Sequence, residues 1–494
     1  MASINIDMRN PKSICVVGGG TAGLVSALIL KKTYPTLKVD IVESSDIGII
    51  GVGEGSTEHW KEFMDFLNID PTEMLKETDA TFKAGIYFEN WTETPYIQTV
   101  EGDYHAIWHD YPIVYGKLIS EQADSLVFDS VWNSEVAWDN HILETVKEFP
   151  VAQFHFNTNK LNQYLHKIAG NFGIDVYDDI ITDVEVDETG ITNLIGEKEN
   201  YNYDFYIDCT GFKRVLMNKL EAKWTSYSEH LKMNSAIVFP TEDEDEYPMW
   251  TLARAMDAGW MFRIPTYGRK GNGYIFDKNY ITPEQAKQEV EEYLGREINV
   301  AKSFTFDPGR LEECWIKNCA AVGLSASFVE PLEATSIGTS IQQSFLLSSR
   351  IINYTDRSIE LYNQEVKEIL EDIKDFVALH YVVDREDTAF WKAQKSVPLP
   401  ERLEKNMEMW KHRLPIDSDF GSENSYKLFD KLNYLLVLHG IGHFDIESIK
   451  QQYQSISPSA RDFADRLIHD LESSKDEARF VPHKMFIELV RKIS

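Results

Sequence analysis

The stretch ICVVGGGTAGLVSALILKKT, residues 14–33, decides the fold class of this chain. It begins as an apolar strand, passes through a glycine-rich turn and continues as an apolar helix. The turn places Gly18, Gly20 and Gly23 in the spacing G-x-G-x-x-G. In this spacing the first glycine makes the tight turn, the second lets backbone amides approach a pyrophosphate, and the third permits close packing of the helix. The stretch therefore predicts a dinucleotide-binding α/β fold.

A second strand, KVDIVE at 38–43, completes a βαβ unit and ends on Glu43. A carboxylate at this place accepts hydrogen bonds from ribose hydroxyls, while the helix N-terminus faces the phosphates with its partial positive charge. Together these parts predict a bound adenine dinucleotide, NAD or FAD. FAD is favoured because the strand-then-glycine segments at 206–212 and 319–328 return to the same nucleotide, whereas an NAD dehydrogenase normally completes its site in one contiguous run.

The composition indicates a folded globular protein. Its 494 residues are 43% hydrophobic and 12% aromatic, enough for two or three domains or one large composite domain. The 80 Asp and Glu against 49 Lys and Arg give a formal net charge of -31, which repels a nucleic-acid backbone and an anionic membrane alike. We therefore expect neither a nucleic acid nor a membrane as a partner.

Cysteine usage and the N-terminal residues bear on the compartment. The four cysteines, Cys15, Cys209, Cys314 and Cys319, are scattered and fit neither a disulfide scaffold nor a zinc site. The first residues lack a charged segment followed by an apolar run, and no stretch approaches the roughly 18 continuous apolar residues of a membrane span. These features predict a cytoplasmic protein.

The rest of the chain divides by pattern. Aromatic-rich segments with strand-like alternation occupy about 82–155 and 233–280, and the acidic run EDEDE at 242–246 is most simply a solvated loop. From about 341 onward the pattern becomes helical. We expect a nucleotide-binding α/β core assembled from separated segments, an inserted aromatic-rich sheet and a helical C-terminal third.

One lysine stands in an otherwise apolar segment, DATFKAGIYFENW at 79–91. If the segment is a strand, one of its faces is entirely apolar: Phe82, Ala84, Ile86 and Phe88. Lys83 lies on the other face with Gly85 and Tyr87. From this segment alone, the simpler interpretation is a strand with one wet face that carries Lys83.

Three further motifs give the chain a family resemblance: GVGEGST at 51–57, GWMFRIP at 259–265 and SFVEPLEATSIG at 327–338. With the glycine turn and TFKAG at 81–85, they resemble the flavin-dependent tryptophan halogenase family. The order of these motifs is collinear with the family from about residue 14 to about residue 440. The resemblance reverses the first interpretation of Lys83.

In that family, reduced FAD reacts with oxygen to give a flavin hydroperoxide, which a halide attacks to yield hypohalous acid. The acid passes through an internal tunnel to a lysine beside the organic substrate, and by position that lysine is Lys83. Partial desolvation in a tunnel lowers the pKa of a lysine, which could then form a haloamine or donate a hydrogen bond that aims the oxidant. Glu333 matches the second catalytic residue, which could accept the ring proton or polarise the oxidant. From the residues alone, Glu333 could equally cap the following helix.

The resemblance also implies a halide site, a barrier and a substrate contact. Backbone amides of Thr335 and Ser336 are expected to bind halide, and because Ser336 replaces the family's usual glycine, bromide or iodide stays open beside chloride. Trp260, Phe262 and Pro265 belong to the motif that separates substrate from flavin, with Phe262 in place of a second tryptophan. Tyr434 stands where the family often has two adjacent aromatic residues against the substrate, so the acceptor is a phenol or indole not restricted to free tryptophan.

The residues expected to bind FAD are Gly18, Gly19, Gly20, Thr21, Ala22, Gly23, Glu43, Ser44, Ile47, Glu54, Gly55, Asp208, Gly211, Leu324 and Ile337. No segment resembles an NADPH site, and the family commonly takes FADH2 from a separate flavin reductase, which we therefore expect as a partner. A homo-oligomer is compatible with the sequence. His439 and His443 have i, i+4 spacing but no third ligand nearby, so no metal site is predicted.

The predicted fold class is α/β, with a Rossmann-like FAD-binding core of the flavin monooxygenase type, an inserted antiparallel aromatic-rich sheet and a helical C-terminal module. We expect the core at 1–350, with substrate-covering sheet segments at about 100–155 and 216–300, and a substrate-binding module at 351–494. Two alternatives to a halogenase stay open. One is an FAD-dependent aromatic hydroxylase, which needs no tunnel lysine, and the other is a non-catalytic dinucleotide-fold binding protein.

Overall fold

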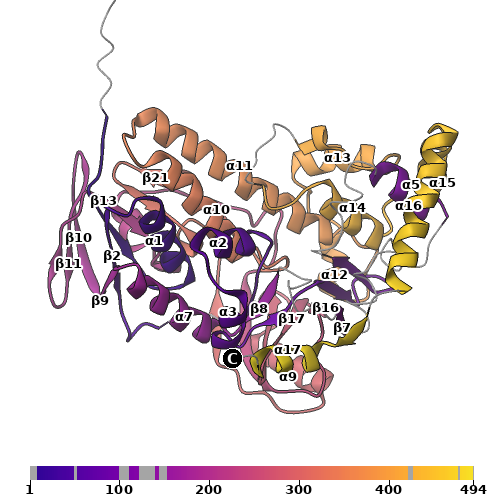
Figure 1. The fold of residues 1–494 in the computed structure, drawn as a ribbon, viewed down its shortest axis with the longest axis horizontal. Coiled ribbons are helices and arrows are strands. Elements are labelled where there is room, and N and C mark those ends of the chain that lie inside the picture. The colour runs from indigo at the N-terminus through magenta and orange to yellow at the C-terminus, as the bar shows by residue number, and fades with distance from the viewer. Residues whose placement is uncertain are drawn as a thin grey trace, which may run out of the picture.

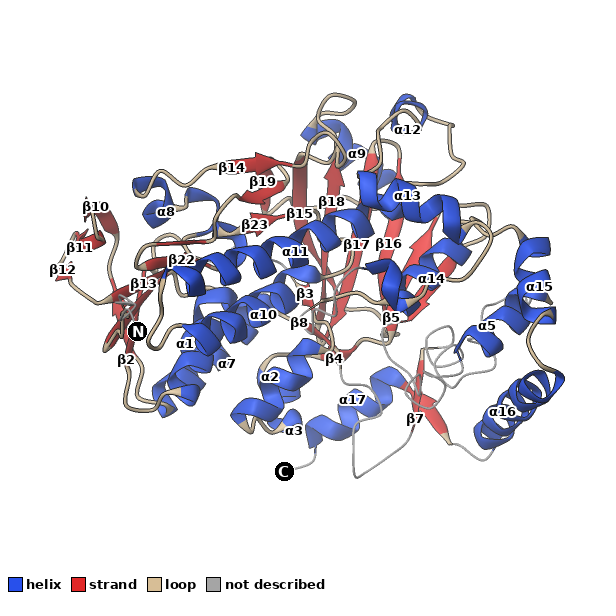
Figure 2. Ribbon diagram, turned by 90° about the horizontal axis from the view of Figure 1, so that it is seen from above, coloured by secondary structure: helices blue, strands red, loops and turns tan. Residues whose placement is uncertain are grey.

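The computed structural model describes residues 8–48, 53–99, 111–121, 140–143, 153–420, 427–476 and 479–492. Figures 1 and 2 show the α/β part around α1 and β2 at one end of the molecule, the largest sheet in the middle, and helices α5, α15 and α16 at the opposite end. The fold class agrees with the prediction: a mixed α/β chain with a helical C-terminal region.

A six-stranded sheet forms the α/β part. Its strands, in spatial order, are β21 (Trp315–Ile316), β22 (Cys319–Ala321), β13 (Phe205–Asp208), β1 (Ser13–Val17), β2 (Lys38–Glu43) and β9 (Asp175–Asp178). Neighbouring strands are parallel except β21 and β22. Segments far apart in the sequence thus place their carboxyl ends at one edge, as the repeated strand-then-glycine pattern predicts.

Helix α1 (Thr21–Thr33) packs on β1 and β2 of this sheet, and two further helices pack on α1: α7 (Thr158–Asn171) and α10 (Thr335–Arg350). Small residues let α1 and α10 approach closely, and the hydroxyls of Ser26 and Ser344 lie 2.8 Å apart in their interface. This contact brings the start of α10 to the sheet edge at which the glycine turn lies.

A seven-stranded sheet forms the middle of the molecule. Its order is β19 (Lys302–Thr305), β15 (Ser235–Glu242), β18 (Arg269–Phe276), β17 (Gly259–Thr266), β16 (Trp250–Met256), β5 (Gly85–Glu89) and β6 (Tyr96–Thr99). All neighbours are antiparallel except β16 and β5. The inserted, largely antiparallel, aromatic-rich sheet is therefore confirmed. Helix α9 (Pro283–Leu294) packs on β15 and β18.

The segment at 79–91 is not one strand. It forms β4 (Thr81–Phe82), which pairs with β8 (Phe154–Phe156), and then β5, which belongs to the large sheet. The chain leaves one sheet and enters the other at Lys83. Both sides of the segment are covered at this crossing, and a wet strand face does not form.

The sheet expected at about 100–155 is largely absent where the structure describes that range, although much of the range lies outside the described residues. Residues Tyr111–Ser120 form helix α5, and β7 (His141–Leu143) pairs with β24 (Phe480–Pro482) away from the large sheet. Aromatic and β-branched residues favour a strand there, but the buried positions are helical in spacing: Val114, Tyr115, Leu118 and Ile119. That face packs on α15 and α16.

The C-terminal region is mainly helical, as predicted. Its helices are α11 (Asp356–His380), α12 (Ala389–Gln394), α13 (Glu401–Trp410), α14 (Lys431–Gly440), α15 (Ile446–Gln454), α16 (Pro458–Asp476) and α17 (His483–Lys492). Helix α11 packs on α10, and α14 packs on β6. The domain division at 350 stays a prediction. In the described part of the chain, no helix is long and apolar enough to cross a membrane.

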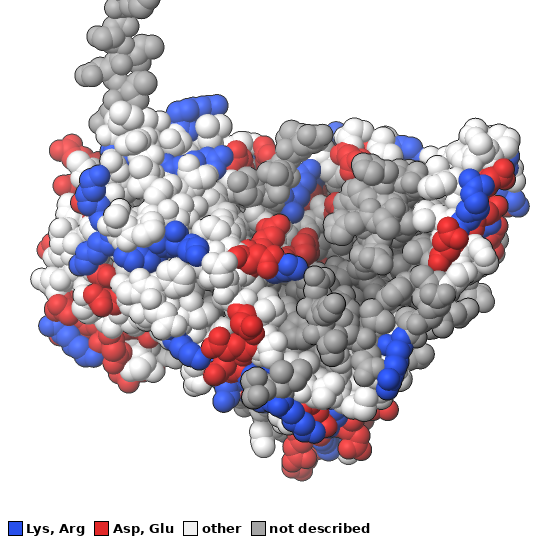
Figure 3. All heavy atoms as spheres, viewed as in Figure 1, with Lys and Arg blue, Asp and Glu red and all other residues white. Residues whose placement is uncertain are grey.

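The remaining elements connect these layers: β3 (Glu54–Gly55), α2 (His59–Leu67), α3 (Pro71–Glu77), β10 (Ile181–Asp187), β11 (Gly190–Gly196), β12 (Asn200–Tyr201), α8 (Val215–Lys219), β14 (Trp224–Ser226), β20 (Gly309–Leu311) and β23 (Ser327–Phe328). Acidic and basic side chains are interspersed on the face shown in Figure 3.

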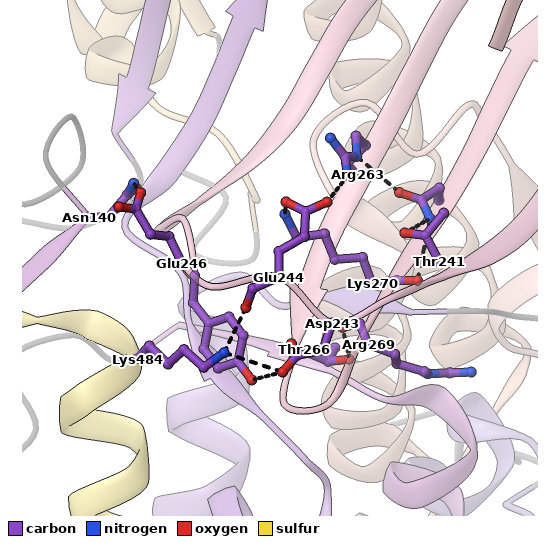
Figure 4. A network of polar contacts seen from close by, with 12 residues as sticks. Asn140, Thr241, Asp243, Glu244, Glu246, Arg263, Thr266, Arg269, Lys270 and Lys484 are labelled. Carbon is purple, nitrogen blue, oxygen red and sulfur yellow. Dashed lines mark hydrogen bonds and ion pairs between the residues drawn. The ribbon is translucent and has the colours of Figure 1, made fainter. Parts of the chain in front are cut away.

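The acidic run at 242–246 is not simply a solvated loop. Figure 4 shows Glu244 between two cations of β17 and β18, Arg263 and Lys270, with a 2.5 Å contact to Arg263. Lys484 of α17 contacts the carboxylate of Asp243 at 3.3 Å and donates to the Glu244 carbonyl at 2.7 Å. The run is held because basic side chains of three separate elements converge on it.

Candidate active site

A cavity with a volume of about 410 Å³ opens at the carboxyl edge of the six-stranded sheet. Most residues expected to bind FAD line it: Gly18, Gly19, Gly20, Thr21, Ala22, Glu43, Ser44, Ile47, Glu54, Gly211, Leu324 and Ile337. They come from the turn after β1, the end of β2 and the turn that follows it, β3, the turn after β13, the turn after β22 and the start of α10. The topology thus gathers them from six separated segments.

The glycine turn has the geometry that its sequence predicts. Gly18 has φ +113°, and a β carbon there would lie 2.2 Å from the carbonyl oxygen of Cys209. A β carbon on Gly23 would lie 1.9 Å from the Gly18 oxygen, whereas a β carbon on Gly20 would have no neighbouring atom within 4 Å. The first and third glycines are required by packing, and the second leaves the backbone open to a ligand.

Asp208 and Gly55 lie elsewhere than expected. Asp208 is completely buried behind the cavity wall, where its carboxylate accepts hydrogen bonds of 2.9 Å from the amides of Leu216 and Met217. It also accepts a 2.7 Å bond from Thr210. Asp208 therefore shapes the turn at 209–211 and does not face the cavity. Gly55 lines a second cavity described below.

Helix α7 also contributes to the cavity, and no sequence motif predicts this. Thr158 and Asn162 line the large cavity, and the Asn162 side-chain amide donates to the Gly19 carbonyl at 2.7 Å. Lys213, in the turn after β13, lines it too and brings a positive charge. Its place in TGFK, directly after the predicted strand, is the only sequence signal for these three residues.

The cavity fits a dinucleotide such as FAD. The open backbone at Gly20 leaves room for a pyrophosphate, and the helix N-terminus of α1 carries no acidic residue in its first turn. At the other end of the cavity, burial raises the pKa of Glu54 to about 7. The Glu54 Oε2 atom is buried with no hydrogen-bond partner among the described residues, so a ligand group can supply the missing bond.

A smaller cavity of about 70 Å³ shares Glu54, Ser336 and Ile337 with the large one. It extends past Phe262 to Ala334, which precedes α10. The Gly51 and Val52 part of the GVGEGST motif lies outside the described residues. A narrow apolar space therefore leads from the cofactor cavity toward the segment that carries Glu333.

Lys83 is 0% exposed. Its Nζ donates to the carbonyl of Ser56 at 2.8 Å, so the interpretation of a wet face is wrong. Gly55 lies between Lys83 and the Glu333 segment: a β carbon on Gly55 would be 3.6 Å from Lys83 Cδ and 3.1 Å from Ala334 Cβ. The structure thus brings the two predicted catalytic segments together on either side of Gly55.

Glu333 is 2% exposed and faces two polar side chains. Its Oε1 lies 2.7 Å from His380 Nε2. With the Gln98 amide in the orientation that pairs donors with acceptors, its nitrogen lies 2.5 Å from both Glu333 oxygens. The helix-capping alternative is wrong, since α10 has Ala334 at its N-cap and no side-chain capping bond. Neither His380 nor Gln98 stands in a motif, and sequence reasoning missed both.

The three residues expected to form the barrier lie in different surroundings. Trp260 is buried, and its Nε1 donates to Glu330 Oε2 at 2.6 Å. Phe262 lines the small cavity, with its ring centroid 6.0 Å from that of Trp260. Pro265 lines neither cavity, and its carbonyl accepts a 2.7 Å bond from Thr81. Phe262 is therefore the aromatic side chain of the motif that faces the space between cofactor and Ala334.

Tyr434 does not join this group. It packs in an aromatic cluster of the helical module, with ring centroids 4.8 Å from Phe376 and from Phe420. Its neighbour Asn433 points toward the site instead and donates to the Gln98 oxygen at 3.1 Å. The helix turns the polar residue toward β6 and the aromatic one toward the core of the module.

Thr335 and Ser336 open helix α10, whose first turn contains no acidic residue. Ser336 lines the cofactor cavity, the small cavity and a third cavity of about 30 Å³, which Thr335 also lines. Ala334, just before them, has a left-handed backbone with φ +54°. The amides at this helix start are thus available to an anion beside the cofactor cavity. No cluster of three or more His, Cys, Asp or Glu suited to a metal occurs among the described residues.

Comparison with known proteins decides the family. A family model described as tryptophan halogenase matches residues 13–454. The chain belongs to the tryptophan halogenase family. It is 31% identical over 481 residues to the tryptophan 6-halogenase SttH of Streptomyces toxytricini, covering 88% of this chain and 90% of that protein. It is 32% identical over 473 residues to the 7-chloro-L-tryptophan 6-halogenase KtzR of Kutzneria sp. (strain 744), covering 86% and 90%.

Solved structures agree with this assignment to the tryptophan halogenase family. A tryptophan C-6 flavin-dependent halogenase from taromycin biosynthesis superposes with a TM-score of 0.88 at 26% identity, covering 97% of this chain and 100% of that one. The resemblance seen in the motifs is confirmed, and the chain is a flavin-dependent halogenase. The comparisons favour neither the hydroxylase nor the non-catalytic alternative. Family membership implies FAD and a halide ion as reactants.

Proposed function

We propose that this halogenase uses FADH2 from a separate reductase to halogenate an indole or phenol at a site formed by Lys83 and Glu333. When bound, reduced FAD supplies hypohalous acid from O2 and a halide. The observation that carries the proposal is the meeting of the Lys83 and Ala334 side chains at Gly55, beside a cavity that shares its wall with the cofactor cavity. The buried amine is then within reach of an oxidant that enters through this space.

The two residues have separate roles. Lys83 Nζ, held by the Ser56 carbonyl, receives the oxidant and directs its halogen atom to the acceptor. Glu333 accepts the proton that the aromatic ring loses. Phe262 keeps the acceptor away from the cofactor cavity, which prevents direct hydroxylation.

The halide is bound by the amides of Thr335 and Ser336, supported by their position at the start of a 16-residue helix. Ser336 places a hydroxymethyl group among three cavities, and we expect bromide or iodide to be used in addition to chloride. The four cysteines are free, which agrees with the reducing cytoplasm.

The test is product mass. The protein is incubated with a flavin reductase, NADH, FAD, O2, one halide at a time and a panel of indoles and phenols. The proposal expects products in which halogen replaces hydrogen, and none when the reductase is left out. A product with one added oxygen would support the hydroxylase, and the absence of oxygen consumption would support a binding protein. Steady halogenation without the reductase would contradict the proposed need for a separate flavin reductase.

A further inference from the structure

Helix α11 ends at the site with a histidine that no motif predicts. His380 is 0% exposed, and its Nε2 lies 2.7 Å from Glu333 Oε1. The imidazole lies between the rings of Phe88 and Phe376, with both centroids 5.0 Å away. A ring held in this way has one orientation, and Glu333 is its polar neighbour.

The hydrogen bonds of His380 determine where its hydrogens lie. Its Nδ1 is 2.8 Å from the carbonyl oxygen of Phe376. A carbonyl oxygen only accepts, so Nδ1 carries a hydrogen. Between Nε2 and Glu333 Oε1 there must be one further hydrogen, because two lone pairs at 2.7 Å repel each other. The pair therefore holds one hydrogen more than a neutral imidazole beside a carboxylate.

Gln98 places that hydrogen on the histidine. The Gln98 amide has its nitrogen toward Glu333 and its oxygen toward Asn433, since the opposite orientation would set oxygen against oxygen and nitrogen against nitrogen. Both Glu333 oxygens then face N–H donors. This environment suits an ionised carboxylate, which only accepts hydrogen bonds. The flanking aromatic rings also suit a cation.

We infer that His380 is a positioning residue for Glu333: as an imidazolium it fixes the direction of the side chain and keeps it a carboxylate in a site closed to water. The inference rests on the proposed role of Glu333. In the reaction the ring carbon bonds to the halogen, hypohalous acid loses hydroxide, and the ring proton passes to Glu333 and then to hydroxide, giving water. Only an ionised Glu333 can take that proton.

Without His380, Glu333 would be a buried carboxylate that keeps one neutral hydrogen-bond partner and loses its adjacent positive charge. Its oxygens would no longer be held in one direction beside the acceptor, which makes it a less effective base. Lys83 would be unaffected at its own bond to the Ser56 carbonyl. Loss of His380 should thus slow ring substitution and leave oxidant production intact.

The test compares two variants with a control. His380→Gln keeps an N–H donor without the charge, and His380→Phe keeps neither. His443→Gln is the control. His443 is partly buried in the helical module and, like His380, bonds a carbonyl, that of Met407 at 2.8 Å, but it has no carboxylate hydrogen-bond partner among the described residues. Each is assayed for FADH2 oxidation, for hypohalous acid trapped by taurine, and for kcat and KM of the aromatic acceptor.

We expect His380→Gln to lower kcat for the halogenated product about 10²-fold, with KM, FADH2 oxidation and trapped oxidant within about threefold of wild type. His380→Phe should lose at least as much, and His443→Gln should lose nothing. A wild-type kcat in His380→Gln would overturn the inference. If wild type itself makes no halogenated product, the proposed function fails, and a second measurement then decides the inference.

That measurement is nitrogen NMR of the full chain labelled with ¹⁵N-histidine at neutral pH. The His380 signals are identified by their change in Glu333→Gln. The inference expects both ring nitrogens of His380 to carry hydrogen. A bare Nε2 would overturn it whether or not the variants fold.

Discussion

At the scale of single residues, Glu330 is the clearest case of a buried acid. Burial raises its pKa to about 7, although hydrogen bonds from Tyr381 and Trp260 work in the opposite direction. Its Oε1 has no partner among the described residues. Since the folded pKa lies above the ordinary value of 4.5, the charged form is disfavoured in the folded state.

The sign of the pH effect follows. The contribution of Glu330 to stability is fully present below pH 4.5 and is lost as pH rises toward about 7. Glu330→Gln has no charged form and still offers an oxygen to Trp260 and Tyr381. From pH 5 to pH 8, the free energy of unfolding of the variant relative to wild type should rise by up to roughly 3 kcal/mol. Urea unfolding of both proteins at the two pH values checks this, and a pH-independent difference would refute it.

The meeting of distant residues could be predicted from the sequence where family motifs mark them. Lys83 and Glu333 are marked by TFKAG and PLEA, and the structure brings their segments together at Gly55. His380 and Gln98 could not be predicted, because no local pattern signals a side chain that meets Glu333 across two other elements. Tyr434 shows the converse: the resemblance predicts a substrate contact there, but the helix turns this side chain into an aromatic cluster of the helical module.

At the scale of elements, the joint between β3 and the start of α10 depends on Gly55. A β carbon there would be 3.1 Å from Ala334 Cβ, tighter than ordinary contact, and 3.6 Å from Lys83 Cδ. Gly55→Ala should therefore lower stability by about 1 kcal/mol with most activity kept. Gly55→Val adds methyl groups between the two catalytic segments and should cut halogenated product per FADH2 oxidised at least about tenfold. If both variants form the same amount of halogenated product per FADH2 oxidised, the space at Gly55 is not used by the oxidant.

The pairing of Glu244 with β17 and β18 gives a second prediction at this scale. Glu244 pairs with Arg263 and with Lys270, which is 5% exposed. Glu244→Ala leaves a buried ammonium without its counter-charge and should lower the free energy of unfolding by about 2 kcal/mol. Asp245→Ala, at an exposed neighbour, is the control and should change it by less than about 0.5 kcal/mol. Denaturant unfolding measures both, and equal losses would contradict the pairing.

Helices and strands were predictable where the hydrophobic periodicity and the turn residues agree. The strand, glycine turn and helix at 14–33 form as their pattern predicts. The composition of helix α5 predicts a strand, because it is rich in aromatic and β-branched residues. The helical spacing of its apolar residues extends over only ten residues and is a weaker signal. The expected strand at 79–91 is interrupted at Lys83, because its two halves pair with strands of different sheets, which is a tertiary effect.

At the scale of the whole molecule, the two sheets divide the chemistry. The six-stranded sheet and the start of α10 form the cofactor cavity, and the seven-stranded sheet supplies Phe262, Gln98 and the strand that follows Lys83. Helix α10 joins them, since its first residues line all three cavities. We propose that the oxidant is made beside the cofactor cavity and used beyond the smaller cavity, with the buried amine of Lys83 between them.

The most direct measurement of this account is the ratio of halogenated product formed to FADH2 oxidised in a single turnover of Lys83→Ala. Lys61→Ala, which removes an exposed lysine of α2 paired with Asp65, is the control. We predict that Lys83→Ala oxidises FADH2 at the wild-type rate and forms less than about 1% of the wild-type product. Product formation at the level of wild type and of Lys61→Ala would contradict it.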